Sequence, residues 1–296
     1  MISIILILLF VFSVLSVPVC HGVISGLYLY GMKIFPGLFI SFILTNILVR
    51  ILQQKNINNP WILVITGLMT GFPNGAYICS WYNKNNPENR LGDMLAGIIN
   101  IPSPAFLISY VYINILEKCI SLPMFLALTY TPVILCSYMA ILLFRDKDNK
   151  KDNAPHIKND KKLIFHFFEE AVDSSINTAL KLGAYVIIFS VIVNIIMHFS
   201  QSNTAGLLIS YLFEISNGLA IIKNAGIPMN ITVLLTVLLD AFGGVCIIMQ
   251  TKSICSSYIS IKKYIYQKLV LCIVTLAMTY LPVSYTHLTL PTNSRV

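Results

Sequence analysis

Long apolar runs separated by short polar stretches dominate the hydropathy pattern of this chain. The runs cover residues 2–17, 24–52, 61–82, 91–116, 121–144, 181–199, 204–222, 230–250 and 265–282. A hydrocarbon core about 30 Å thick takes about 20 apolar residues per helix, so most of these runs can cross a bilayer. The pattern predicts an all-α polytopic integral membrane protein with eight or nine spans or hairpins. We interpret residues 2–17 as a retained first span, with a cleaved signal peptide as the alternative.

One strongly polar segment, residues 145–162, divides the chain into a first membrane half at 1–144 and a second at 163–283. The segment is rich in lysine, and the positive-inside rule places it in the cytoplasm as a solvated loop. Within residues 163–180, apolar positions recur every three or four residues, and acidic residues lie on the opposite face. This spacing predicts an amphipathic helix in the cytoplasmic interface before the next span.

The lysines of the second half indicate which of its segments face the cytoplasm. Lys252, Lys262, Lys263 and Lys268 cluster around the start of the last apolar run and indicate a return to the cytoplasm. This favours a re-entrant hairpin at 230–250 that turns at Phe242-Gly243-Gly244, with a full crossing as the alternative.

Composition excludes a water-soluble protein. Hydrophobic residues make up 56% of the 296 positions and charged residues 11%, against about 25% charged in a typical soluble domain. The lipid bilayer is therefore the expected partner. The net charge of +8 belongs to loops and head-group contacts, and nucleic acid is not expected as a partner. Seven cysteines without a CxxC pair indicate reduced thiols and no metal site.

The two halves resemble one another. Lys33 precedes Asn46 at the spacing at which Lys181 precedes Asn194, and the stretch from Thr66 to Phe72-Pro73 aligns with that from Thr236 to Phe242-Gly243. Corresponding interrupted segments in two halves are typical of secondary transporters. The alternative is a helical bundle with ordinary kinks.

Four interruptions of apolar helices are the candidate substrate-binding segments. Proline and glycine break a membrane helix, and the freed backbone groups must line protein or water. Amino-terminal ends of the resulting half-helices suit an anionic group. The candidate residues are Gly71, Pro73, Asn74, Gly75, Asn100, Ser103, Glu214, Ser216, Asn217, Gly243, Gly244 and Gln250.

Charged residues within apolar runs have two interpretations each. A charge near the bilayer centre costs roughly 2.5–3.5 kcal/mol, so Glu214 and Asp240 should face a cavity or a partner. Either acid is a coupling-ion site or a gate, or it fixes helix packing through a protonated or hydrogen-bonded carboxyl. Lys33 and Lys181 attract substrate or extend to the interface.

Enzyme motifs are absent: the chain has no HExxH, no GxSxG and no phosphate-binding loop. We expect neither an enzyme nor a cofactor.

The interrupted segments resemble those of the YlbJ-type sporulation integral membrane protein family. The resemblance rests on Gly71 to Ala76, Asn100 to Pro104, Glu214 to Gly218, and Phe242-Gly243-Gly244 followed by Gln250, and it covers roughly residues 25–282 in the expected order. That family carries the nucleoside-recognition "gate" domain, which is similar to parts of concentrative nucleoside transporters. The chain differs from the family pattern at Pro102-Ser103-Pro104 and at Asp240.

The resemblance implies transport during sporulation, with dipicolinic acid moved from mother cell to forespore across the outer forespore or mother-cell membrane. We expect alternating access with a small-molecule substrate bound at mid-membrane. The alternatives are a nucleoside-type carrier and a non-transporting assembly protein of the spore envelope, and a homo-oligomer stays open. Residues 284–296 are polar and look like a non-native tail.

Overall fold

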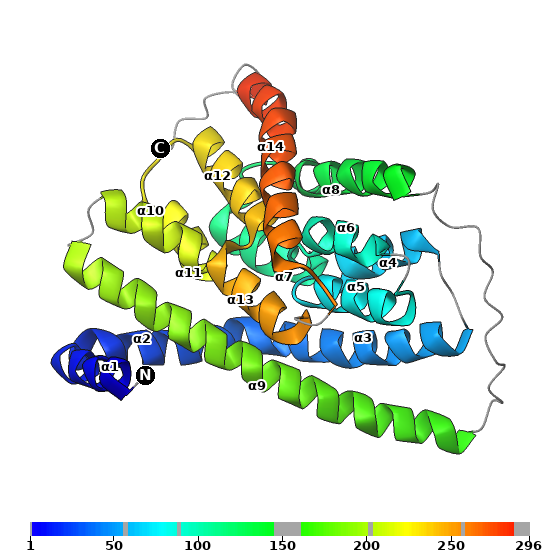
Figure 1. Cartoon of the computed structure of the whole chain (residues 1–296). Helices are drawn as coiled ribbons and strands as arrows, with labels where there is room; N and C mark the ends of the chain where they lie inside the picture. The colour runs from blue at the N-terminus through cyan, green and yellow to red at the C-terminus, as the bar shows by residue number, and fades with distance from the viewer. Residues whose placement is uncertain are drawn as a thin grey trace.

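Helices are the only regular elements in the described part of the chain (Figure 1). The computed structural model describes residues 2–55, 59–87, 90–144, 161–200, 204–255 and 258–286. Four helices there are long and apolar enough to cross a membrane: Leu91–Ile115, Leu122–Leu143, Phe168–Ser200 and Met229–Cys255. A fifth is counted if the pair Ser16–Ile34 and Leu38–Leu52, bent by 58°, forms one span. The prediction of an all-α polytopic membrane protein is confirmed.

The first half is a series of helices broken at glycine and proline. Its elements are α1 (Ile2–Val14), α2 (Ser16–Tyr28), the π-helical η1 (Leu29–Ile34), α3 (Phe35–Lys55), α4 (Pro60–Thr70), α5 (Asn74–Asn85), α6 (Leu91–Ile99), α7 (Pro104–Phe106), the π-helical η2 (Leu107–Ile115) and α8 (Leu122–Phe144). The bend in the long run at 24–52 lies between Ile34 and Leu38, next to Pro36, whose ring disfavours a continuous helix.

The second half also places short helices between long ones. It contains α9 (Lys161–Ser200), α10 (Thr204–Phe213), α11 (Ile215–Asn224), α12 (Met229–Phe242), α13 (Gly244–Cys255) and α14 (Ile261–Thr286). The interfacial helix predicted at 163–180 is not separate from the next span, because α9 is one helix of 40 residues, about 60 Å long. No proline or glycine occurs between Lys161 and Leu182 to end it.

Helices α4 and α5 form a hairpin that turns at residues 71–73. Beside α6, Gly67 lies against Ile99 and Gly71 against Ser103, so α4 runs with α6. On α5, Gly75 lies against Ile99 whereas Cys79 lies against Gly92, so α5 runs against α6. Helices of 11 and 12 residues are too short to cross a bilayer separately.

Helices α10 and α11 form the corresponding hairpin of the second half. Its turn is the single extended residue Glu214, and Gly218 of α11 packs against the backbone of Tyr211 in α10. Each hairpin is followed by a broken span, which is α6–α7–η2 in the first half and α12–α13 in the second.

Two sequence expectations about the second half are wrong. Residues 229–255 form one apolar span with a break at Gly243, and not the re-entrant hairpin favoured above, because Gly243 caps α12 in the left-handed region and α13 then continues the span. By the order of the helices, the turn at 71–73 corresponds to Glu214, and the break at 100–103 corresponds to Gly243. The alignment of Thr66 to Phe72 with Thr236 to Phe242 therefore pairs non-equivalent elements.

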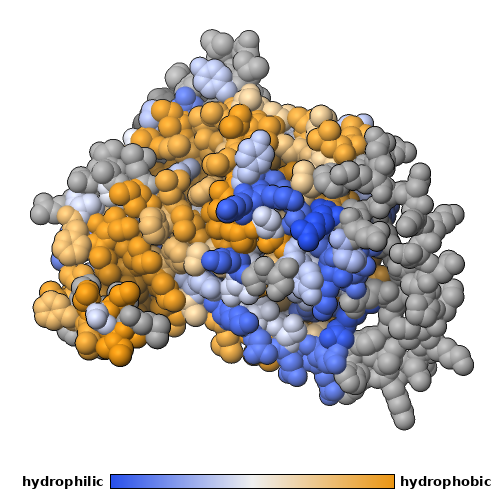
Figure 2. Space-filling model, in the orientation of Figure 1, coloured by the Kyte–Doolittle hydropathy of each residue, from blue (hydrophilic) through white to orange (hydrophobic). Residues whose placement is uncertain are grey.

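The surface separates into an apolar part and a polar end. Figure 2 shows hydrophobic residues over most of the visible face and hydrophilic ones gathered at one side. Exposed lysines and an arginine of α5, α13, α14 and the α5–α6 connection contribute charge to the protein surface: Lys84, Arg90, Lys252, Lys262 and Lys263. Residues 145–160 and 287–296, which include most of the predicted polar loop and tail, lie outside the described residues.

Candidate functional site

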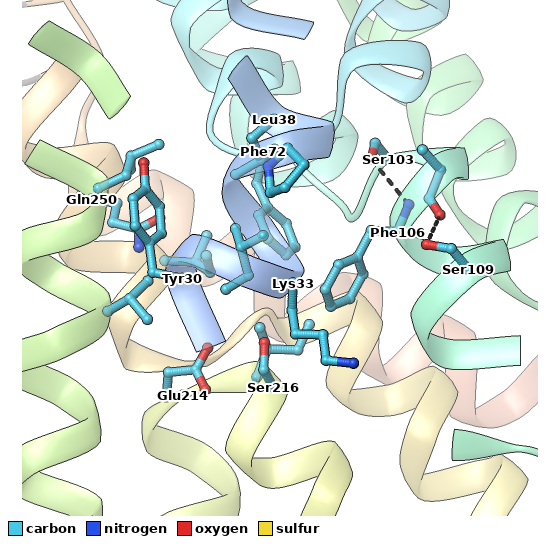
Figure 3. Close-up of a pocket in the computed structure, with 17 residues that line it drawn as sticks. Tyr30, Lys33, Leu38, Phe72, Ser103, Phe106, Ser109, Glu214, Ser216 and Gln250 are labelled. Atoms are coloured by element: carbon cyan, nitrogen blue, oxygen red, sulfur yellow. Dashed lines mark hydrogen bonds between the residues drawn. The ribbon is translucent and has the colours of Figure 1, made fainter. Parts of the chain in front are cut away.

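A cavity of about 250 Å³ lies between the two halves (Figure 3). Its wall combines the bend before α3, the turn of each hairpin, the break in the first span, α9 and α13. The lining residues include Tyr30, Lys33, Leu38, Phe72, Ser103, Phe106, Ser109, Leu182, Val186, Glu214, Ser216 and Gln250. Both halves therefore contribute to one cavity, as the prediction of a site between broken helices requires.

Glu214 is the acidic residue of the cavity and the N-cap of α11. Its backbone is extended, and its Oε2 accepts a hydrogen bond of 2.7 Å from the backbone N–H of Asn217. The side chain is 2% exposed, so the carboxylate is held in place by the helix end that it caps. Ser216 follows on the first turn, and its carbonyl accepts a 3.2 Å hydrogen bond from the Tyr110 hydroxyl.

Lys33 is the basic residue of the cavity. It belongs to η1, its side chain is exposed, and no hydrogen bond or ion pair engages it within the described residues. In Figure 3 its side chain points to the same side of the cavity as Glu214 and Ser216. Lys181, its counterpart in the sequence repeat, is exposed on α9 and does not line the cavity.

The aromatic part of the wall comes from Tyr30, Phe72 and Phe106. Phe72 and Phe106 lie with ring centroids 6.4 Å apart, and Phe106 follows Ser103, whose Oγ accepts a 3.4 Å hydrogen bond from the Phe106 N–H. The Tyr30 hydroxyl donates a 2.5 Å hydrogen bond to the Ala179 carbonyl of α9. These contacts fix flat apolar surfaces around a small polar centre.

The first hairpin turn packs closely on the break in the first span, behind the wall of the cavity. The Phe72 N–H donates to the Ile101 carbonyl at 2.9 Å. A Cβ on Gly71 would lie 2.4 Å from the Ser103 nitrogen, and one on Gly75 would lie 2.8 Å from the Ile99 carbonyl oxygen. Glycine is therefore required for the turn to pack on the break at 100–103.

The second hairpin turn packs on its own break in the same way. A Cβ on Gly244 would lie 3.2 Å from the Leu212 carbonyl oxygen and 3.3 Å from that of Phe213, next to Glu214. Each turn thus contacts the break of the span that follows it, and the two halves repeat this arrangement.

Asn100 holds the first break to three other helices. Its Nδ2 donates to the Tyr264 hydroxyl at 2.8 Å and to Thr251 Oγ1 at 3.2 Å, and its Oδ1 accepts from the Ala76 N–H at 3.2 Å. The side chain is fully buried and outside the cavity wall.

Four of the candidate residues, Ser103, Glu214, Ser216 and Gln250, line the cavity. The other eight lie in the turns and breaks behind the wall: Gly71, Pro73, Asn74, Gly75, Asn100, Asn217, Gly243 and Gly244. Sequence reasoning missed Tyr30, Phe106 and Ser109, and it named Phe72 in a motif without assigning it to the site. Ser103-Pro104 marks a helix start, a signal that Phe106 and Ser109 lie on its first turns.

A second pocket, of about 350 Å³, lies farther along α3, α9 and α13. Its polar lining includes Asn46, Arg50, Tyr77, Ser80, Lys84 and Ser174. Arg50 forms an ion pair with Glu170 of α9. Between the two pockets, Phe42, Ala179 and Leu182 form an apolar cluster in which each residue is at most 2% exposed. We call this cluster the plug.

Two charged residues of the second half lie outside both pockets. Asp240 of α12 is fully buried, and neither of its carboxylate oxygens has a hydrogen-bond partner in the described structure. Lys268 was assigned above to a cytoplasmic lysine cluster, but the structure buries it completely within α14, because it lies on the face of that helix that packs on α6 and α12.

Comparison with protein-family models, curated proteins and solved structures finds no match for this chain. The family resemblance described above stays a prediction.

Proposed function

We propose that this protein is a membrane carrier that moves a small anionic metabolite by alternating access, with the 250 Å³ cavity as its binding site. One observation carries the proposal: the cavity lies where two hairpin turns and a broken span converge from both halves. Discontinuous helices that meet between repeats are the arrangement in which secondary transporters bind substrate.

The cavity offers groups suited to a flat anion. The helix that begins at Pro104 and continues to Ile115 starts at the wall, and so does α11. Helix amino termini favour negative charge, and Lys33, which has no ion-pair partner among the described residues, adds a cation. Phe72, Phe106 and Tyr30 supply apolar surface for a ring. Dipicolinate, a planar dianion, combines these features and is the solute that the family resemblance implies, in the context of sporulation.

Glu214 favours a second candidate. A buried carboxylate repels an anion but accepts hydrogen bonds from hydroxyl groups, as a nucleoside-type substrate would offer. The two candidates therefore differ in whether Lys33 or Glu214 makes the decisive polar contact.

The plug explains how the cavity can open to one side of the membrane at a time. Phe42 and Leu182 separate the cavity from the second pocket, which lies near the cationic residues Arg50 and Lys84. Movement of α3 against α9 would open the plug and connect the two pockets, and the solute would leave through the second one.

Uptake into liposomes tests the proposal. Protein purified without residues 284–296 is reconstituted, and uptake of labelled dipicolinate is followed with nucleosides as competitors. The variants Lys33→Gln and Lys181→Gln form a matched pair, because only Lys33 lines the cavity. We expect saturable uptake whose KM rises at least tenfold in Lys33→Gln and is unchanged in Lys181→Gln.

The other outcomes separate the candidates. Uptake that nucleosides block and that Glu214→Gln abolishes, with Lys33→Gln unaffected, favours a nucleoside-type carrier. Folded protein that moves neither class of solute refutes the carrier and favours an assembly role in the spore envelope.

A further inference from the structure

Lys268 connects the breaks of the two broken spans. Its Nζ donates a hydrogen bond of 2.5 Å to the Asn100 carbonyl and one of 2.9 Å to the Ala241 carbonyl. Asn100 is the C-cap of α6, and Ala241 lies in the last turn of α12. One ammonium group therefore bonds to the carboxyl ends of two half-helices.

The two spans run past α14 in opposite directions. Along α6, Asp93 bonds to Ser260, just before α14, and to Lys263 of α14, whereas Gly97 bonds to Gln267, so the residue numbers of the two helices rise together. Along α12, Ala241 bonds to Lys268 while Leu238 lies at Cys272, so the numbers rise in opposite senses. The carboxyl ends of α6 and α12 meet at Lys268.

The surroundings of Lys268 hold negative potential without a carboxylate. The carboxyl end of a helix carries about half a negative charge, and two such ends converge here. Within the described residues no aspartate or glutamate lies within ion-pair distance of Lys268, and the centroid of the Tyr264 ring lies 5.8 Å from Nζ. In the described part of the chain, the fully buried amino group of Lys268 thus bonds to backbone carbonyls alone.

This position is linked to both sides of the cavity. The first hairpin turn bonds to the first break through Phe72 and Ile101, next to Asn100. The second turn packs on Gly244, which follows the second break close to Ala241. Separating Lys268 from either carbonyl removes one of the contacts between the two breaks, beside that of Asn100 with Thr251.

In ion-coupled carriers, unwound backbone carbonyls and the carboxyl ends of half-helices coordinate the coupling cation. We propose that the Lys268 ammonium is a built-in cation at this position, which replaces a bound metal ion and makes the protein independent of Na⁺. The inference rests on the proposed function for its role in transport, but its structural part is tested by melting alone.

The test compares variants that leave or fill the space of the lysine. Lys268→Ala removes the three outer carbons and Nζ, which n-propylammonium matches, whereas Lys268→Met fills the space without charge. Lys263→Ala is the control, because Lys263 lies on the same helix with its side chain 51% exposed. Melting is followed by tryptophan fluorescence in detergent, with NaCl, n-propylammonium chloride or choline chloride at equal concentration.

We expect Lys268→Ala to melt about 5–15 °C below the unsubstituted protein in choline, because two buried carbonyls lose their donor. Na⁺ or n-propylammonium should restore at least half of that loss. Lys268→Met should melt lower than the unsubstituted protein and respond to neither cation, and Lys263→Ala should change little. The unsubstituted protein should melt at the same temperature in NaCl and in choline chloride.

Three results would overturn the proposal: Na⁺-specific stabilisation of the unsubstituted protein, a Lys268→Met variant as stable as the unsubstituted protein, or a folded Lys268→Ala variant that neither cation stabilises. The first two decide the matter even if Lys268→Ala does not fold. In liposomes, uptake should be equal with and without a Na⁺ gradient. If no solute is taken up in any salt, the proposed function fails while the melting result still stands.

Discussion

Gly71 gives the sharpest test of the packing between a hairpin turn and its break. Its φ of 72° and ψ of −173° lie in a region that only glycine adopts readily, and a Cβ there would lie 2.4 Å from the Ser103 nitrogen and 2.8 Å from the Ser103 Cα. Both atoms belong to the backbone, so the clash is relieved only if the turn moves away from the break.

The expected cost of Gly71→Ala has two parts. The backbone conformation costs about 1–3 kcal/mol for a residue with a side chain. Forcing the extra carbon into a packed site costs about 1–3 kcal/mol more. The sum of about 2–6 kcal/mol corresponds to a fall of about 3–10 °C in melting temperature for a protein of this size.

Two other glycines allow the backbone cost and the packing cost to be measured separately. Gly226 has a φ of 64° with no atom within 4 Å of an added Cβ, so Gly226→Ala should show the backbone cost alone. Gly31 has neither feature and lies in η1, so Gly31→Ala should leave stability unchanged or raise it slightly. Melting of the three variants in detergent is the assay. If Gly71→Ala melts no lower than Gly226→Ala, the close packing of turn on break described here is refuted.

Four further predictions concern single side chains. Phe42→Ala removes the largest residue of the plug, so liposomes that contain the variant should leak a small anionic dye. The substitution should also lower the free energy of unfolding by about 3–5 kcal/mol. A less stable variant whose liposomes retain the dye would contradict the gating role. Glu214→Gln should keep the stability of α11, since the amide oxygen still caps it, whereas Glu214→Ala should cost about 0.5–2 kcal/mol in thermal unfolding; equal losses would argue against capping. Asp93→Ala should destabilise by about 2–4 kcal/mol and Lys263→Ala by at most about 1, because only the aspartate is buried and accepts from the Ser260 N–H; a double-variant melting series measures both, and similar values would contradict this. Asp240→Leu should raise the melting temperature by several degrees, since it removes a buried carboxylate without a partner; a fall would indicate an interaction absent from the described structure.

Local sequence features predicted the breaks but not how they pair. Glycine and proline act on their own helix, so Gly71-Phe72-Pro73 and Phe242-Gly243-Gly244 mark interruptions without any tertiary information. Which break each turn contacts depends on helix direction, and a one-dimensional alignment of apolar segments does not contain that direction. The alignment of residues 66–72 with 236–242 was wrong for this reason.

The burial of Lys268 was within reach of a periodicity argument. Tyr264, Lys268, Leu271 and Thr275 recur every three or four residues and are all buried, whereas Lys262, Lys263 and Tyr266 are exposed on the other face. Treating the lysines as one cluster overlooked that Lys268 lies on a different face of the helix from Lys262 and Lys263. The place of Tyr30 in the cavity was not predictable in the same way, because it depends on the 58° bend that brings η1 towards α9.

The position of Lys268 in the chain also bears on the order in which the protein is assembled. Each hairpin turn packs on a break within its own half, so these contacts form between neighbouring segments as they enter the membrane. The ammonium that joins the two halves lies on α14, which follows every other described helix. Until α14 inserts, the carbonyls of Asn100 and Ala241 lack this donor, and the two halves are joined only by contacts such as those of Tyr30 and Arg50 with α9 and of Asn100 with Thr251. The bond between the two breaks is therefore completed only when the last described helix is in place.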